Sequence, residues 1–167
     1  MLVVGSGYIG VELSGVLAAF GSDVTLTGRG ARILRAFDSE IACFVQENMA
    51  RLGVNFRLEC QPVQIAKTES GRYSIIFSNC PDPEPYDLVI YTVGRVANTQ
   101  ALQLEIPGVA VNSKGFVKAD ALHNTNIEGI YALGDVSGEV MLTPVAVKAG
   151  RTLADRLFSG SQAVMDY

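Results

Sequence analysis

Residues 3–10 read VVGSGYIG, a short apolar segment that runs directly into Gly5, Gly7 and Gly10. This is the G-x-G-x-x-G spacing of dinucleotide-binding loops. The first glycine allows the turn off a strand, the second admits a pyrophosphate close to the backbone, and the third lets the next helix pack on the strand. The free amides and the dipole of that helix favour negative charge. Because an apolar strand precedes the glycines and a helical pattern follows them, we expect a dinucleotide loop here.

The pattern beyond the loop predicts an α/β fold with a Rossmann-like, doubly wound parallel sheet and an inserted β-meander. Helical spacing of apolar residues indicates helices over 11–20 and 39–52, the second capped by Asp38. The proline-rich run 81–85 is interpreted as a connection, and the apolar run 87–93 as the last parallel strand, covered on both faces. The predicted strands of this region are 2–4, 23–27, 54–58, 62–67, 72–78 and 86–91.

The organisation of the chain changes near residue 97. Residues 99–126 hold short segments punctuated by glycine and asparagine, the apolar run 127–133 predicts a strand, and 143–158 predicts a helix with Pro144 in its first turn. We therefore predict a dinucleotide-binding domain over 1–97 and a partial second α/β domain over 98–167. Because the chain opens on its cofactor loop, we also expect it to be part of a longer protein.

Composition argues against several classes of function. The chain has 167 residues, of which 49% are hydrophobic and 18% charged, which is typical of a globular protein. Its net charge of −4 argues against nonspecific binding of nucleic acid, and no apolar run approaches the ~20 residues that span a bilayer. Cys43, Cys60 and Cys80 fit no zinc or C-x-x-C spacing, so we expect no metal site and reduced thiols, as in a cytoplasmic protein.

The residues after the second predicted strand indicate which nicotinamide cofactor is bound. NAD sites usually carry an acid there, which bonds the ribose 2′-hydroxyl. This chain instead has Thr27, Gly28 and Arg29, and Arg32 and Arg35 follow on the same loop. A guanidinium group offers a phosphate two parallel, charge-assisted hydrogen bonds. We infer NADP(H), with the 2′-phosphate held by Arg29 and Arg35. The alternative is a solvated basic turn.

A second candidate site follows the predicted strand 127–133, which ends in Gly134 and Asp135. A carboxylate at the carboxyl edge of a sheet lies where α/β proteins bind ligands, and it can accept hydrogen bonds from sugar hydroxyls. The alternative, which the pattern favours equally, is an Asp that caps a following turn. Residues 142–146 then open a helix whose amides are placed to face an electron-rich ring edge.

Taken together, these stretches resemble the FAD-dependent pyridine nucleotide–disulfide oxidoreductases, and within that family most closely the glutathione reductases. The resemblance implies NADPH and FAD as cofactors. It also implies glutathione disulfide as the substrate of an intact enzyme that dimerises through a further C-terminal domain. Dihydrolipoamide dehydrogenase, trypanothione, thioredoxin and mercuric reductases remain alternatives, as does a non-catalytic dinucleotide-binding module. The matching stretches are VVGSGYIGVE, the loop 29–35 with LRAFD, YTVGRVANT, TNIEGIYALGDV and LTPVAVKAGRTLADRLF.

The resemblance also implies individual roles. Tyr8 would lie over the flavin in the nicotinamide pocket and Glu12 would contact the nicotinamide side, although the residues alone also fit a surface tyrosine and an acid of the first helical turn. Asp135 would bond FAD in its ribitol region, and residues 142–146 would lie against its ring system. The implied cofactor-binding residues are Gly5, Gly7, Tyr8, Ile9, Gly10, Glu12, Arg29, Arg35, Gly94, Gly134, Asp135, Leu142 and Thr143.

The groups that reduce disulfides in this family do not occur in the sequence. The chemistry needs a C-x-x-x-x-C pair and a histidine paired to a carboxylate. The three cysteines are too far apart, and the only histidine, His123, lies in a Leu-His-Asn context rather than the family's His-Pro setting. We therefore expect no catalytic residue in this chain. By itself it should bind NADPH weakly and catalyse no disulfide reduction.

Overall fold

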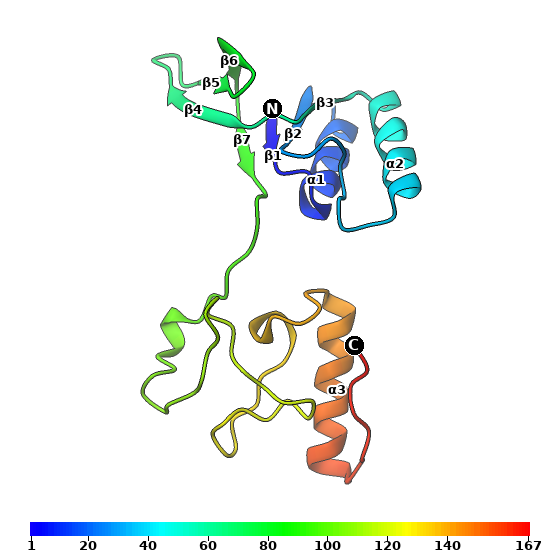
Figure 1. The fold of residues 1–167 in the computed structure, drawn as a ribbon, viewed down its shortest axis with the longest axis vertical. Helices are drawn as coiled ribbons and strands as arrows, with labels where there is room; N and C mark the ends of the chain where they lie inside the picture. The colour runs from blue at the N-terminus through cyan, green and yellow to red at the C-terminus, as the bar shows by residue number, and fades with distance from the viewer. The chain divides into compact units, whose positions relative to one another are not determined.

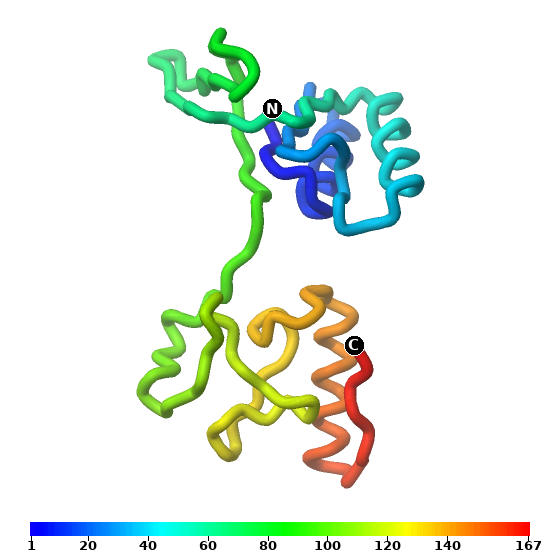
Figure 2. The backbone as a smooth tube through the Cα atoms, viewed as in Figure 1, coloured from blue at the N-terminus to red at the C-terminus, as the bar shows by residue number.

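The computed structural model describes residues 1–167, and these residues form two compact units, Met1–Gly94 and Arg95–Tyr167. The first unit contains both sheets of the protein and two α-helices (Figure 1). The second contains one α-helix and mostly irregular backbone, which can be followed in the backbone trace (Figure 2). Each unit has its own buried apolar cluster.

A four-stranded parallel sheet with the strand order β3-β2-β1-β7 forms the centre of the first unit. Strand β1 lies between β2 and β7, and Leu2 is opposite Thr25 on one side and Val89 on the other. All four strands run in the same direction, so their carboxyl ends meet at one edge, which is where the glycine loop begins. The strands are β1 (Leu2–Val4), β2 (Val24–Gly28), β3 (Val54–Leu58) and β7 (Val89–Tyr91).

Two helices cover one face of this sheet. Helix α1 (Tyr8–Ala19) follows β1 and begins three residues before the predicted start at residue 11. Helix α2 (Ser39–Arg51) ends one residue before the predicted end. The predicted cap is confirmed, because Asp38 Oδ1 accepts hydrogen bonds from the amides of Glu40 and Ile41 at 3.0 and 3.1 Å.

The alternation of side chains along β1 separates two apolar clusters. Val3 packs on the helical side with Val11, Ile33 and Met49. Leu2 and Val4 point to the other face, where they pack with residues of a second, antiparallel sheet. The α/β class with a Rossmann-like parallel sheet and an inserted meander is thus confirmed. The meander itself, rather than a helix, covers the second face of the parallel sheet.

The meander has the order β4-β5-β6, with β4 at Pro62–Lys67, β5 at Tyr73–Phe77 and β6 at Cys80–Tyr86. The prediction that residues 81–85 form a connection is wrong, since they lie inside β6. Pro81, Pro83 and Pro85 occupy every second position of an edge strand, so the amides they lack are on the side that has no neighbouring strand. The hairpin turn lies instead between Phe77 and Cys80, which face each other.

The last parallel strand is shorter and more exposed than its apolar sequence predicts. β6 ends at Tyr86 and β7 begins only at Val89, so the predicted single strand 86–91 is two strands. β7 pairs with β1 alone and forms the edge of the sheet. Tyr91 is 56% exposed and Val93 68% exposed, and the prediction of a strand covered on both faces is therefore wrong.

The second unit consists of two 3-10 helices, η1 (Gln100–Leu102) and η2 (Gly134–Ser137), and helix α3 (Thr143–Ser159). Pro144 lies in the first turn of α3, as predicted. The predicted strand 127–133 is wrong. Gly129 has a φ of +79° and the amide of Ile130 donates to the carbonyl of Ile127 at 3.1 Å, so a turn interrupts the apolar run. Its side chains still pack around Val109, Val117 and Ala132.

None of the three α-helices combines the length and the apolar character needed to cross a bilayer.

The Asp38 cap supports a first prediction. Replacing Asp38 with Ala leaves the amides of Glu40 and Ile41 without their acceptor, and the free energy of unfolding should fall by about 1 kcal/mol. Chemical denaturation followed by circular dichroism measures this change. Asp38→Asn is the matched control and should retain most of the stability, because an amide oxygen also caps. Equal stability of Asp38→Ala and the unchanged chain would contradict the prediction.

Candidate functional site

The glycine loop at the carboxyl end of β1 is the tightest part of the structure. Gly5 has a φ of +120°, and a Cβ added there would lie 2.6 Å from the hydroxyl of Thr92. A Cβ on Gly10 would lie only 1.9 Å from the carbonyl oxygen of Gly5. Helix α1 can therefore approach the loop this closely only because residue 10 is a glycine. Two of the three predicted glycine roles, the turn and the close packing, follow directly from this geometry.

Gly7 differs from the other two glycines, because a Cβ added there would meet nothing within 4 Å. It is exposed and has a φ of −78°, so neither packing nor backbone conformation requires a glycine. It is also the N-cap of α1, whose first turn has no side-chain cap and no acidic residue. The start of α1 thus offers amides and open space together, which fits the approach of a phosphate group.

The basic loop, residues 29–35, begins where β2 ends, at the same edge of the sheet. Its centre is anchored, since Ile33 is fully buried and Leu34 donates its amide to the carbonyl of Ser6 at 2.8 Å. Its ends carry the exposed side chains of Arg29 and Arg35. The basic loop, which carries Arg29 and Arg35 at its two ends, is thus joined to the glycine loop by a backbone hydrogen bond.

The guanidinium groups of the basic loop have no carboxylate partner. The four ion pairs of the protein join Glu47 to Arg51, Glu84 to Arg57, Asp87 to Arg72 and Asp135 to Arg95. Asp38, the nearest acid along the chain, uses Oδ1 to cap α2. Three unpaired positive charges next to the uncapped start of α1 make this edge attractive to an anion.

The position that carries an acid in NAD sites is occupied here by a buried hydroxyl. Thr27 is fully buried, and its Oγ1 donates to the carbonyl of Cys60 at 2.8 Å. Gly28 follows at the end of the strand, where a Cβ would lie 2.4 Å from Ser6 Oγ. Neither residue carries a carboxylate that could accept hydrogen bonds from a ribose hydroxyl. The groups available to bind a ligand at the end of β2 are therefore the guanidinium groups of the arginines.

Asp135 lies in the second unit, in the short helix η2, and its neighbour Gly134 has a φ of +68°. The N-cap of η2 is Leu133, and Asp135 is the second residue of this short helix rather than its cap. Its Oδ2 is paired with a guanidinium nitrogen of Arg95, a contact that the sequence did not predict. Both side chains are partly exposed, at 40% for Arg95 and 45% for Asp135. The carboxylate is thus held in place and remains accessible.

The other predicted residues occupy the same two units. Tyr8 and Ile9 begin α1, and Glu12 is exposed on its second turn. Gly94 ends the first unit and has a φ of +150°. Leu142 is the N-cap of α3 and Thr143 its first residue, and both are exposed. The structure brings Tyr8 and Ile9 to the glycine loop and Leu142 and Thr143 to the start of a helix.

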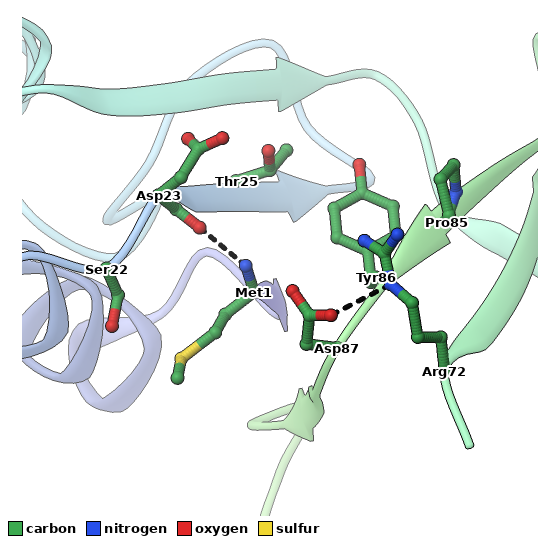
Figure 3. Close-up of a pocket in the computed structure, with 8 residues that line it drawn as sticks. All are labelled: Met1, Ser22, Asp23, Thr25, Arg72, Pro85, Tyr86 and Asp87. Atoms are coloured by element: carbon green, nitrogen blue, oxygen red, sulfur yellow. Dashed lines mark hydrogen bonds and ion pairs between the residues drawn. The ribbon is translucent and has the colours of Figure 1, made fainter. Parts of the chain in front are cut away.

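A pocket of about 220 Å³ lies away from the glycine loop, at the amino ends of β1 and β2 (Figure 3). Its charged groups already have partners, because Arg72 Nε lies 2.8 Å from Asp87 Oδ1 and the amino group of Met1 donates to the backbone carbonyl of Asp23. Burial raises the pKa of the Tyr86 hydroxyl, which donates to Glu84. The pocket is lined by Met1, Ser22, Asp23, Thr25, Arg72, Pro85, Tyr86 and Asp87.

The cysteines and the histidine show no catalytic arrangement. Cys43 is exposed, Cys60 is buried with its Sγ donating to Asn79 at 2.9 Å, and Cys80 is half-buried; all three are free thiols. His123 is only 4% exposed, and its Nε2 has no hydrogen-bond partner. Burial lowers the pKa of His123, with a smaller contribution from the charge of Arg156. No group of side chains is suited to hold a metal ion.

Comparison with known proteins gives a consistent result. The profile of the pyridine nucleotide-disulphide oxidoreductase family matches residues 1–150. Trypanothione reductase from Leishmania donovani is 38% identical over 171 residues, which cover 100% of this chain and 34% of that enzyme. The Cu(II) complex of the HOCl-induced flavoprotein disulfide reductase RclA from Escherichia coli superimposes with a TM-score of 0.90 at 28% identity, covering 99% of this chain and 38% of RclA. A second structure of RclA from Escherichia coli superimposes with a TM-score of 0.89 at 28% identity. The chain thus spans about a third of the length of these relatives.

The glycine loop supports a second prediction. Gly10→Ala forces a Cβ against the carbonyl of Gly5 and should lower the free energy of unfolding by about 2 kcal/mol or more. Gly7→Ala meets no atom, and because Ala is a poor N-cap it should lower the free energy of unfolding by no more than about 1 kcal/mol. Thermal and urea denaturation of the two variants measures the difference. Similar destabilisation by both substitutions would contradict the packing role assigned to Gly10.

Proposed function

Because this chain belongs to the pyridine nucleotide-disulphide oxidoreductase family, we propose that it binds NADPH through its first unit and FAD through its second, as part of a disulfide reductase of the glutathione reductase type. The family is one of oxidoreductases that use FAD and a pyridine nucleotide. When bound beside the first unit, the nicotinamide would supply a hydride, the flavin would accept it, and a disulfide would be reduced in the intact enzyme.

The basic loop is the single observation that carries the choice of NADPH. Arg29 and Arg35 are exposed at the end of β2 without a carboxylate partner, and Thr27 and Gly28 replace the acid that would bind a ribose hydroxyl. A 2′-phosphate carries the charge that two guanidinium groups bind bidentately. NADH offers only a hydroxyl at this position, so it gains nothing from the arginines. The loop therefore favours NADPH.

The glycine loop supports the position of the pyrophosphate. The open space at Gly7 and the uncapped amides of α1 fit a phosphate group, whereas Gly5 and Gly10 have a packing role. In this proposal Tyr8 and Glu12 lie on the nicotinamide side, Ile9 contacts the cofactor from the first turn of α1, and Gly94 borders the site from the end of the unit. These side chains bind and orient the nucleotide and take no part in proton transfer.

The second unit supplies the proposed flavin contacts. Asp135 Oδ2 is engaged by Arg95, which leaves Oδ1 as an acceptor for the ribitol hydroxyls of FAD. The positive φ of Gly134 sets the turn that presents this carboxylate. Leu142 and Thr143, at the uncapped start of the 17-residue helix α3, are placed to contact the flavin ring edge.

Glutathione disulfide is the proposed substrate of the enzyme to which this chain belongs, with dimerisation through a further domain. The relative named trypanothione reductase favours a second candidate, a disulfide of the trypanothione type. The dihydrolipoamide dehydrogenase type generally uses NAD, and the arginines in place of an acid speak against it. The thioredoxin and mercuric reductase types differ from the glutathione type in substrate. Three free thiols fit a cytoplasmic location, which is also part of the proposal.

Cofactor choice is tested by titrating the chain with NADPH and with NADH. The unchanged chain should bind NADPH more tightly, and Arg29→Ala should weaken NADPH binding about 10- to 100-fold, since a charge-assisted hydrogen bond is lost. NADH binding should change by less than about twofold. Arg51→Ala removes an equal charge from the far end of α2 and serves as the control. Equal affinities of the unchanged chain for the two nucleotides would refute the choice of NADPH.

Catalysis by the isolated chain is a separate test. The chain has no C-x-x-x-x-C pair, and its only histidine is buried in the second unit. With NADPH, FAD and glutathione disulfide present, the purified chain should consume NADPH no faster than a sample without protein. Absorbance at the nicotinamide band measures this rate. Turnover that depends on glutathione disulfide would show that the chain carries a catalytic dithiol function of its own.

A further inference from the structure

Arg32 is the third arginine of the basic loop, and it points in a different direction from the other two. Its guanidinium group donates to backbone carbonyls of the residues that follow it. Nη1 lies 3.2 Å from the oxygen of Leu34 and 3.4 Å from that of Phe37. Nη2 lies 3.3 Å from the oxygen of Arg35 and 3.4 Å from that of Phe37. A fifth contact, from Nη1 to the oxygen of Ile33, is 3.5 Å long.

These hydrogen bonds connect one guanidinium group to several backbone carbonyls of a strained turn. Leu34 has a φ of +51°, in the left-handed region that a leucine rarely adopts, so the turn needs external support. One support is the bond from the amide of Leu34 to Ser6, and another is the buried side chain of Ile33. Arg32 is the third, because its planar guanidinium group also contacts the carbonyls of Arg35 and Phe37, which the other two supports do not involve.

The turn determines where Arg35 lies. The stem of Arg35 folds back over Gly30, so that a Cβ on Gly30 would lie 2.6 Å from Arg35 Cδ. This placement is possible only while the backbone between residues 30 and 35 keeps its path. Arg32 stabilises this backbone conformation because its Nη2 donates a hydrogen bond to the carbonyl of Arg35.

We propose that Arg32 is a positioning residue for the 2′-phosphate site: it binds no phosphate and instead holds the turn that directs Arg35 toward the cofactor. This inference rests on the proposed function of the loop in NADPH binding. Both terminal nitrogens of Arg32 are occupied by carbonyl oxygens, whereas Arg29 and Arg35 are exposed. Within a cluster of three arginines, two bind the phosphate and one orders the loop.

Two substitutions separate this role from a simple charge effect. Arg32→Lys keeps the charge, but a single ammonium group cannot span carbonyls on both sides of the turn. Arg32→Met keeps the length of the side chain and removes the charge. If Arg32 positions Arg35, both variants weaken NADPH binding by a similar factor, about five- to tenfold, and change NADH binding less than about twofold.

The experiment is calorimetric titration of the full chain and its variants with NADPH, NADH and 2′,5′-ADP, with Arg51→Met as the control of equal charge. If Arg32→Lys binds NADPH within twofold of the affinity of the unchanged chain, the proposal is overturned. This holds whether or not Arg32→Met also retains its affinity. Equal losses for NADPH and NADH would also overturn it, since they indicate general damage. If the unchanged chain does not distinguish NADPH from NADH, the proposed function fails, and this inference fails with it.

Hydrogen exchange of the ligand-free chain provides a readout that does not depend on the nucleotide. The amide of Leu34 donates to the carbonyl of Ser6 and the amide of Phe37 to the carbonyl of Leu34, each at 2.8 Å. Their protection should fall at least about tenfold in both Arg32 variants and stay unchanged in Arg51→Met. Unchanged protection in the Arg32 variants would overturn the positioning role, whatever the titrations show.

Discussion

The close approach of helix α1 to the glycine loop is the contact on which the cofactor edge depends. A Cβ on Gly10 would lie 1.9 Å from the Gly5 carbonyl, so the spacing between strand and helix is fixed by the absence of one carbon atom. On its other side Gly5 abuts Thr92, which follows β7 and donates its hydroxyl to the carbonyls of Val4 and Gly5. The loop is therefore held between a helix and the last strand. Its amides keep their direction without any ligand.

The same loop also supports the basic segment. Its Ser6 accepts the amide of Leu34, and the Ser6 side chain occupies the space that a Cβ on Gly28 would need. A shift of the glycine loop would consequently move the turn from which Arg35 extends. The two loops that we propose to bind the pyrophosphate and the 2′-phosphate are thus joined through a single residue. In that proposal, the coupling would favour a dinucleotide that places both phosphates correctly over either phosphate alone.

Most of the first unit could be predicted from local sequence, because its signals act over a few residues. The glycine spacing, the Asp38 cap and the alternation in β1 needed no knowledge of distant contacts. The sequence-based predictions failed where the structure depends on pairing between residues far apart in the chain. Pro81–Pro85 can form a strand because β6 lies at the edge of the antiparallel sheet. β7 is exposed because it lies at the edge of the parallel sheet. The direction of the Arg32 side chain depends on the carbonyls of a strained turn, which no charge pattern reveals.

The Arg95–Asp135 pair shows the same use of arginine in the second unit. Both groups are nearly half exposed, and an ion pair so open to water adds little to stability. Its physical effect is on orientation: a guanidinium bound to Oδ2 fixes the rotation of the carboxylate and leaves the lone pairs of Oδ1 for another donor. Asp135 lies inside η2, whose N-cap is Leu133, so its carboxylate is not in the cap position of that helix. Orientation toward an external hydroxyl is therefore the role that we propose for the pair, in parallel with the role proposed for Arg32 in its turn.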